Sequence, residues 1–161
     1  MNFDHKIFPL ESLKDIKIDK TKKIVLAGGC FDILHYGHVH FIRKARSAGD
    51  ILILLLESDE FITQIKKKKA VHTQRQRAEI LAALGYVDYV VSLPLLKNPD
   101  IDYERIVKEI RPSIIALTSP DSKESQKRKL AQEVHAETLI IPYLSSFSSS
   151  QLITYAPIFR N

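Results

Sequence analysis

Two histidines three residues apart follow a pair of glycines, and this is the part of the sequence best suited to chemistry. The segment reads Gly28-Gly29-Cys30-Phe31-Asp32-Ile33-Leu34-His35-Tyr36-Gly37-His38. The apolar run at residues 23–27 predicts a buried strand before it, and apolar residues at helical spacing from Phe41 predict a helix after it. A helix that begins here presents free backbone N–H groups and the positive end of its dipole. The segment therefore predicts a phosphate-binding corner.

Other interpretations of the same segment are weaker. A zinc site would need His35, His38 and His40 together, but His40 lies two residues beyond His38 and would face another side of the helix. Cys30 could be a thiol nucleophile, although a cysteine beside an apolar strand usually packs. We therefore expect no metal held by protein side chains.

Length and composition indicate one soluble domain. The chain has 161 residues, of which 45% are hydrophobic and 27% charged, enough for one core and too few for two. We expect a single domain over residues 1–161, with a lead-in segment at 1–20 and a tail at 154–161. One cysteine fits the reducing cytoplasm, and neither a signal-peptide core nor a membrane-spanning run is evident.

The formal net charge of +5 and the pI near 9.3 suit an anionic ligand. Charge alone would also allow nucleic acid as a partner. The sequence contains no recognisable nucleic-acid-binding motif and no interleaving of aromatic and basic residues, so we expect a small anionic ligand instead.

Five apolar runs separated by helical segments predict an α/β fold with a five-stranded parallel sheet and right-handed crossovers. In such a sheet the ligand lies at the carboxyl ends of the strands, at the point where the chain reverses its direction of winding. The predicted strands are residues 23–27, 51–56, 87–93, 113–117 and 138–142. Ser58 and Thr73 are expected to cap the two helices that follow the second strand, Thr73 with Gln76 as a capping box.

The motif Cys30-Phe31-Asp32, followed by His35-Tyr36-Gly37-His38 and by R-x-A-x-x-x-G-D at residues 43–50, resembles the H-x-G-H signature of the cytidylyltransferase-like nucleotidyltransferases. The similarity runs from about Phe8 to about Ile153. Within that family it is greatest to the nucleotidyltransferase domain of ADP-heptose synthase and to glycerol-3-phosphate cytidylyltransferase. The resemblance implies a single Rossmann-like domain with strand order 3-2-1-4-5.

The same resemblance implies an enzyme that moves NMP from ATP or CTP to a small phosphorylated sugar or alcohol and releases pyrophosphate. The partners would be a nucleoside triphosphate, carrying Mg²⁺, and the phosphorylated acceptor. The implied catalytic residues are His35, His38, Lys66 and Arg77; the implied nucleotide-binding residues are Gly29, Cys30, Phe31, Gly37, Ser148, Ser149 and Ser150. Asp32, Lys69 and Asp121 are expected near the base or the acceptor.

Plainer interpretations stay open for several of these residues. The lysine run at 66–69 could be a solvated charge run, Arg77 an exposed helix arginine, and the serines at 148–150 a flexible tail. Lys66 and Arg77 are singled out because they align with a lysine and an arginine of the family.

Two departures from the family pattern matter. Thr118-Ser119-Pro120-Asp121 stands where the relatives carry a glycine-aspartate motif, and residues 143–147 lack an arginine that relatives often carry. The choice between ATP and CTP is therefore left open. A nucleotide-binding regulator without acceptor chemistry is the alternative function.

The apolar tail at 155–159 predicts a homodimer. The resemblance to the family implies the same, because related enzymes commonly form dimers.

Overall fold

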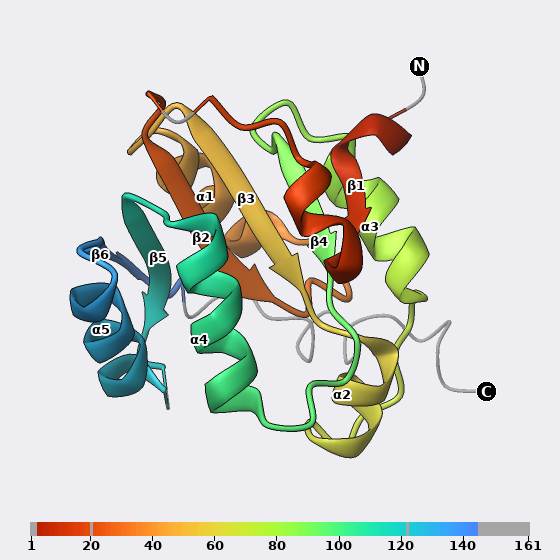
Figure 1. Cartoon of the computed structure of the whole chain (residues 1–161). Coiled ribbons are helices and arrows are strands. Elements are labelled where there is room, and N and C mark those ends of the chain that lie inside the picture. Colours follow the sequence, from red (N-terminus) through yellow and green to blue (C-terminus); the bar gives the residue numbers. More distant parts are fainter. Residues whose placement is uncertain (1–2, 20, 122, 145–161) are drawn as a thin grey trace.

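The structure, a computed structural model, describes residues 3–19, 21–121 and 123–144. Strands and helices alternate along the chain, and helices cover both faces of one parallel sheet (Figure 1). The strands are β1 (Ile7–Pro9), β2 (Ile24–Gly29), β3 (Ile51–Leu56), β4 (Tyr89–Ser92), β5 (Ile114–Ser119) and β6 (Glu137–Pro142). The helices are α1 (Tyr36–Arg46), α2 (Asp59–Gln64), α3 (Gln74–Ala82), α4 (Pro99–Ile110) and α5 (Glu124–Glu133), with short 3₁₀ helices at Asp4–Lys6 and Leu10–Asp15.

The predicted number of five strands is wrong, because the described residues contain six, in the order β1-β4-β3-β2-β5-β6. The additional strand is β1, which pairs in parallel with β4 at the sheet edge, with Ile7 opposite Val90. Three residues are too few to show a strand pattern in sequence, and pairing with the finished sheet supplies the order. The other five strands keep the predicted arrangement, with β2 at the centre between β3 and β5.

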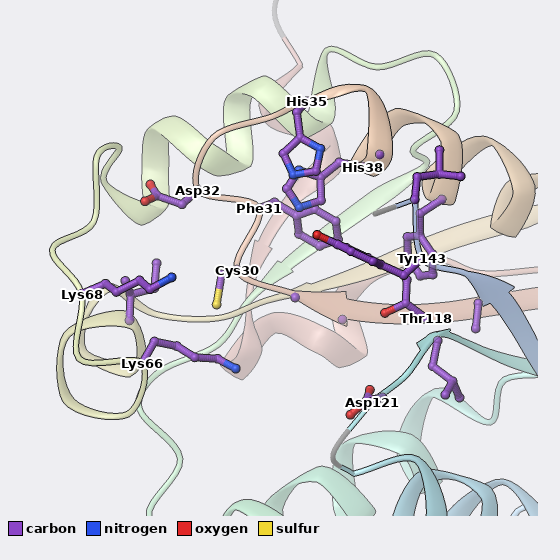
Figure 2. A pocket seen from close by; sticks show the side chains of 18 of the residues that line it. Cys30, Phe31, Asp32, His35, His38, Lys66, Lys68, Thr118, Asp121 and Tyr143 are labelled. Carbon is purple, nitrogen blue, oxygen red and sulfur yellow. The ribbon is translucent and has the colours of Figure 1, made fainter. Parts of the chain in front are cut away.

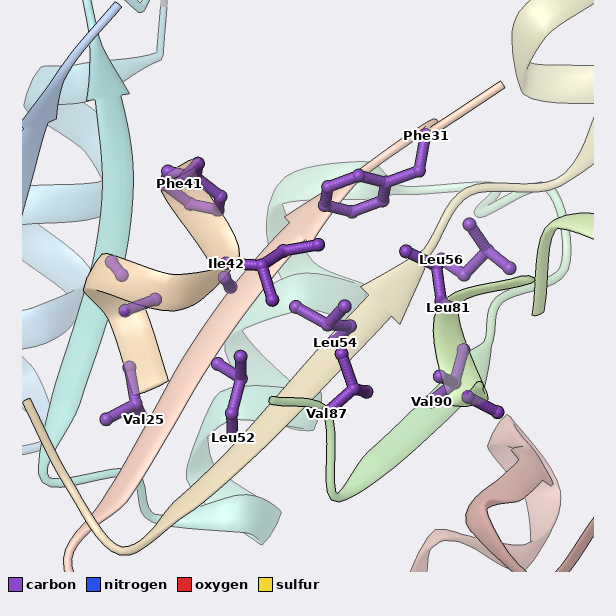
Figure 3. Packing of buried hydrophobic residues seen from close by; sticks show 14 of the residues in the cluster. Val25, Phe31, Phe41, Ile42, Leu52, Leu54, Leu56, Leu81, Val87 and Val90 are labelled. Carbon is purple, nitrogen blue, oxygen red and sulfur yellow. The ribbon is translucent and has the colours of Figure 1, made fainter. Parts of the chain in front are cut away.

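Two apolar layers enclose the sheet. On one face, residues of β2, β3 and β4 pack against Phe41 and Ile42 of α1 and Leu81 of α3 (Figure 3). On the other face, Ile106 of α4 and Ala131 of α5 belong to a second cluster with residues of β2, β3, β4 and β5, and α5 covers β5 and β6. Every residue of β3 from Leu52 to Leu56 is buried, as a central parallel strand covered on both faces requires.

Side-chain caps fix where the helices next to the carboxyl edge of the sheet begin. The Ser58 hydroxyl accepts a hydrogen bond of 3.1 Å from the Phe61 N–H, which confirms the predicted cap of α2. Thr73 and Gln76 form the predicted capping box at the start of α3, with hydrogen bonds of 3.0 and 3.3 Å. None of the helices in the described ranges is long and apolar enough to cross a membrane.

Gly49 lies where the chain turns from α1 into β3 and passes directly over the start of β2. A Cβ atom at this position would lie 2.6 Å from the Lys23 carbonyl oxygen and 2.7 Å from Cγ2 of Val25. The Asp50 N–H donates to the same carbonyl at 2.8 Å, so the backbone there has no room to move away. Close backbone approach is therefore what Gly49 provides.

Replacement of Gly49 by alanine should lower the free energy of unfolding by about 2 kcal/mol, because the new methyl group overpacks a rigid contact. Gly85→Ala is the matched control, since among the described residues nothing lies within 4 Å of its added Cβ. Urea denaturation of both variants measures the difference. An equal effect at the two positions would contradict this account of Gly49.

Candidate active site

A cavity of about 840 Å³ opens at the carboxyl edge of the sheet, where β2 lies between β3 and β5 (Figure 2). This is the switch point of the winding, the place where ligands bind in open α/β sheets. Its walls come from the end of β2 and the start of α1, from the segment after α2, and from the ends of β5 and β6. It brings together ten of the predicted site residues: Gly29, Cys30, Phe31, Asp32, His35, Gly37, His38, Lys66, Lys69 and Asp121.

The two signature histidines stack on each other at the start of α1. Their ring centroids are 3.8 Å apart with planes inclined by 25°, and Figure 2 shows both rings on one wall of the cavity. His35 is the N-cap residue of α1 but makes no side-chain capping hydrogen bond. The Nδ1 atoms of both rings are buried and have no hydrogen-bond partner among the described residues. Buried polar atoms without a partner are costly, so this corner is prepared for a ligand.

Burial lowers the pKa of the His38 imidazole to about 4, and the neighbouring His35 ring adds to the effect, while a hydrogen bond to the Ile33 backbone opposes it. Burial also lowers the pKa of His35. Near neutral pH the pair is therefore uncharged in the empty protein, and each ring carries one N–H donor and one acceptor. An uncharged pair of this kind can bind an anion through hydrogen bonds.

The Phe31 ring packs against the His38 ring at this corner of the cavity. Its backbone adopts a left-handed conformation, φ 47°, which places the ring 5.2 Å from that of His38. A Cβ atom on Gly29 would lie 3.0 Å from the same phenylalanine ring. A side chain at position 29 would therefore make the Phe31 ring shift away from its place beside His38.

Asp32 lines the cavity, but its carboxylate is already engaged. It accepts hydrogen bonds of 3.0 Å from the backbone N–H groups of Val71 and His72. The Asp32 carbonyl also lies 2.8 Å from Nδ1 of His72. Asp32 therefore ties the segment before α3 to the signature loop, and it is poorly placed to act as a general base.

Four lysines line the cavity together with the histidines. Lys66, Lys68 and Lys69 come from the segment after α2, and Lys127 comes from α5. Figure 2 shows Lys66 and Lys68 across the cavity from the histidine rings. Lys127 was missed in the sequence, and so was Lys68, although it lies within the lysine run. Nothing local in the sequence marks Lys127, because only the fold brings α5 to the cavity.

Asp121 faces this cluster and is held by it. Its carboxylate pairs with Lys127 and accepts a hydrogen bond of 2.8 Å from the Lys123 N–H. Burial would raise the pKa of Asp121, but these hydrogen bonds outweigh it and leave the pKa below its ordinary value. Thr118 and Tyr143 lie beyond it and, with Leu117, form the wall at the ends of β5 and β6.

The prediction that Arg77 contacts phosphate does not fit its position. The side chain is fully buried and is not among the residues that line the cavity. Its guanidinium donates to the carbonyls of Cys30, Glu57 and His72 and pairs with Asp59 at 2.8 Å. Arg77 is a positioning residue beneath the site. The predicted phosphate-binding residues Ser148, Ser149 and Ser150 lie outside the described residues.

A doubly wound sheet with such a cavity at its switch point is typical of a class of nucleotide-binding proteins. The chain belongs to the cytidylyltransferase-like family, whose model matches residues 26–153, and it is a nucleotidyltransferase. This confirms the family and the class of enzyme that the H-x-G-H segment predicts.

Two similar proteins support this assignment to the family. The chain is 40% identical over 133 residues to the FAD synthase of Thermococcus onnurineus, covering 80% of this chain and 85% of that protein. It is 34% identical over 154 residues to the bifunctional protein HldE of Campylobacter concisus, covering 94% of this chain. The chain spans only 31% of the length of that HldE protein.

Two solved structures share the fold. The lipopolysaccharide core biosynthesis protein of Thermoplasma volcanium superposes with a TM-score of 0.61 at 24% identity, covering 76% of this chain and 97% of that one. The pantoate-beta-alanine ligase of Francisella tularensis superposes with a TM-score of 0.63 at 16% identity, covering 96% of this chain and 81% of that one. At these identities the likeness concerns the fold alone.

Arg77→Lys should lower the free energy of unfolding by about 3 kcal/mol, because an ammonium cannot reach all four acceptors and leaves buried carbonyls unpaired. Arg75→Lys on the same helix is the matched control. Arg75 is exposed and, among the described residues, pairs with Asp4 and Glu79, so its replacement should change stability far less than that of Arg77. Urea denaturation measures both. Unchanged stability of Arg77→Lys together with lost nucleotide affinity would instead support a phosphate contact.

The His38 pKa predicts a dependence of stability on pH. In the unfolded chain histidine binds its proton near pH 6.5, whereas folded His38 binds it only near 4. The unfolded state therefore binds more protons between these values, and stability falls as pH drops through this window, by about 3 kcal/mol in total. Urea titrations at several pH values should show a shallower fall for His38→Gln. Parallel curves for the two proteins would contradict the low pKa.

Proposed function

We propose that the protein transfers NMP from ATP or CTP to the phosphate of a small phosphorylated alcohol or sugar. An acceptor phosphate oxygen attacks the α-phosphorus of the nucleotide, the bond to the bridging oxygen breaks, and pyrophosphate leaves. The observation that carries the proposal is the stacked pair of His35 and His38, which line a cavity that four lysines also line and whose buried Nδ1 atoms have no partner among the described residues.

The acceptor phosphate is already an anion, so the reaction needs no general base. This agrees with the engaged carboxylates of Asp32 and Asp121. What the reaction does need is stabilisation of the charge that builds on the transferred phosphate and on the leaving pyrophosphate. The neutral histidines and the free N–H groups of α1 would supply hydrogen bonds to it, and Lys66, Lys68 and Lys127 would neutralise it.

Mg²⁺ is proposed to arrive bound to the triphosphate. Among the described residues no group of three or more His, Cys, Asp or Glu side chains could hold a metal ion. The metal would supply charge neutralisation for the phosphate oxygens that bind it. The chain's own part is to hold the rest of the nucleotide with its lysines and, in this proposal, with Ser148, Ser149 and Ser150.

Both nucleotides should be tested, ATP first. One relative is named an FAD synthase, and the product in that name contains adenine. The wall that would face the base contains Thr118 and Tyr143, which belong to the two segments in which this chain departs from the family pattern. A nucleotide-binding regulator without acceptor chemistry is the rival function, and binding without turnover on any acceptor would favour it.

The homodimer and the cytoplasmic location stay predictions of the sequence. The apolar tail at 155–159, on which the dimer prediction depends, lies outside the described residues.

His38→Ala should lower the rate of pyrophosphate release by a factor of about 10²–10³, the usual effect of removing one donor to a transition-state oxyanion. His40→Ala is the matched control, because His40 lies on the same helix and is not among the residues that line the cavity. The assay supplies each nucleotide with Mg²⁺ and a panel of phosphorylated acceptors. Circular dichroism and urea denaturation confirm that the variants are folded.

Full activity of a folded His38→Ala variant would contradict the role of the histidines. Nucleotide binding without pyrophosphate release on any acceptor would contradict the proposed transfer itself.

A further inference from the structure

Residues 66–69 form a run of four lysines between α2 and α3, which we call the lysine segment. All four residues are exposed, and three of them, Lys66, Lys68 and Lys69, line the cavity. Lys67 is not among the lining residues, and its backbone adopts a left-handed conformation, φ 53°. A lysine ammonium sits on a long, flexible stem, so the path of the backbone decides which of these side chains reach a ligand in the cavity.

The start of the lysine segment is held by α2. The Lys66 N–H donates to the Phe61 carbonyl and the Lys68 N–H to the Ile62 carbonyl, both at 3.2 Å. The Lys66 ammonium also lies 5.8 Å from the centroid of the Phe61 ring, within the range of a cation–π contact. Because Ile62 is buried in the core, this end of the segment has a rigid base.

The end of the lysine segment is held by Asp32 of the signature loop. The Val71 N–H donates to both carboxylate oxygens of Asp32 and the His72 N–H donates to one of them, all at 3.0 Å. The Asp32 carbonyl lies 2.8 Å from Nδ1 of His72, so this nitrogen carries the hydrogen. Figure 2 shows the carboxylate pointing away from the histidine rings, on the side where Lys68 lies. The acceptors of Asp32 are therefore directed to the chain that follows the lysines.

A direct contact between Asp32 and an anionic ligand would be unfavourable, because like charges repel. The carboxylate is matched instead by two backbone N–H groups, which compensate an anion without a cation. Arg77 donates to the carbonyls of Cys30 and His72, so the two chains that Asp32 joins are held a second time from the buried side. This arrangement suits a link between two parts of a site better than a contact with the ligand.

We propose that Asp32 is a positioning residue for polyphosphate binding, because it fixes the end of the lysine segment and so places Lys68 and Lys69 at the cavity. The inference rests on the proposed function in one respect, namely that the cavity binds a polyphosphate. Asp32 belongs to the loop that leads to the histidine pair, so its bonds to Val71 and His72 keep the lysines and the histidines in a fixed relation. It acts on the ligand through the lysines alone.

Calorimetric titration with inorganic tripolyphosphate at several salt concentrations tests this role. Asp32→Ala should lower the affinity roughly tenfold, since exposed ion pairs of modest strength lose their fixed geometry. The affinity should also depend less on salt, because fewer ammonium groups stay close to the ligand. Asp32→Asn keeps Oδ1, which accepts from both N–H groups, and should retain most of the affinity.

Asp50→Ala is the matched control. The Asp50 carboxylate likewise accepts from a backbone N–H, that of Lys23 at 2.8 Å, but at the amino edge of the sheet, and Asp50 does not line the cavity. This variant loses a comparable bond and should keep the wild-type affinity and salt dependence. Urea denaturation checks that each variant is folded.

A background without the two lysines separates positioning from a general loss of structure. In Lys68→Gln/Lys69→Gln, the effect of Asp32→Ala on affinity should shrink to about twofold or less, because the residues through which Asp32 acts are gone. Lys66, which α2 holds, remains to bind the ligand. Lys67→Gln is the control background, in which Asp32→Ala should keep its full effect.

A folded Asp32→Ala variant that binds tripolyphosphate as tightly as the wild type overturns the inference, and so does an equal loss of affinity with and without Lys68 and Lys69. Should Asp32→Ala not fold, Asp32→Asn decides, because tighter binding than in the wild type would show a carboxylate that repels the ligand. These results leave the proposed function standing, since pyrophosphate release measures it separately. A wild-type protein that does not bind tripolyphosphate removes the basis of both.

Discussion

The site depends on one buried cation. Arg77 reaches from α3 to the loop after β2, to the end of β3 and to the first turn of α2, and its charge is balanced by three carbonyls and the Asp59 carboxylate. A guanidinium in the interior is tolerated only when its planar set of donors is matched in this way. Because two of the matched groups are the carbonyls of Cys30 and Glu57, the arginine fixes the carboxyl ends of the two central strands relative to each other. The signature loop begins at that fixed end.

Above this saturated layer the protein leaves groups unsatisfied. The Nδ1 atoms of His35 and His38 are buried without a partner among the described residues, and α1 begins without a side-chain cap. By contrast, α2 is capped by the side chain of Ser58 and α3 by that of Thr73. At a capped helix start a side chain accepts a hydrogen bond from one of the first N–H groups, whereas at an uncapped start these groups can bind an anion. The rigid loops held by Arg77, together with helix N–H groups that no side chain caps, are what an anion-binding site requires.

The sequence predicted what short-range patterns encode. Long apolar runs marked the five strands from β2 to β6, hydroxyl residues marked the caps, and the H-x-G-H segment marked the cavity wall. It missed β1, whose three residues acquire their order by pairing with β4. It also misjudged Arg77, since spacing along a helix gives the residue type and the face but not whether other loops cover that face. Lys127 reaches the cavity only because the fold brings α5 to it.

The charge balance of the cavity explains why neutral histidines suit it. The carboxylates of Asp32 and Asp121 are held by hydrogen bonds within the protein, so neither leaves an uncompensated negative charge facing the ligand. The lysines supply attraction that acts over several ångströms, while the histidines act only at contact. Burial keeps the histidines uncharged until an anion arrives, and the arriving charge itself favours their protonation. The positive charge of the corner would therefore increase when the ligand binds, beside the position where the transferred phosphate gains negative charge.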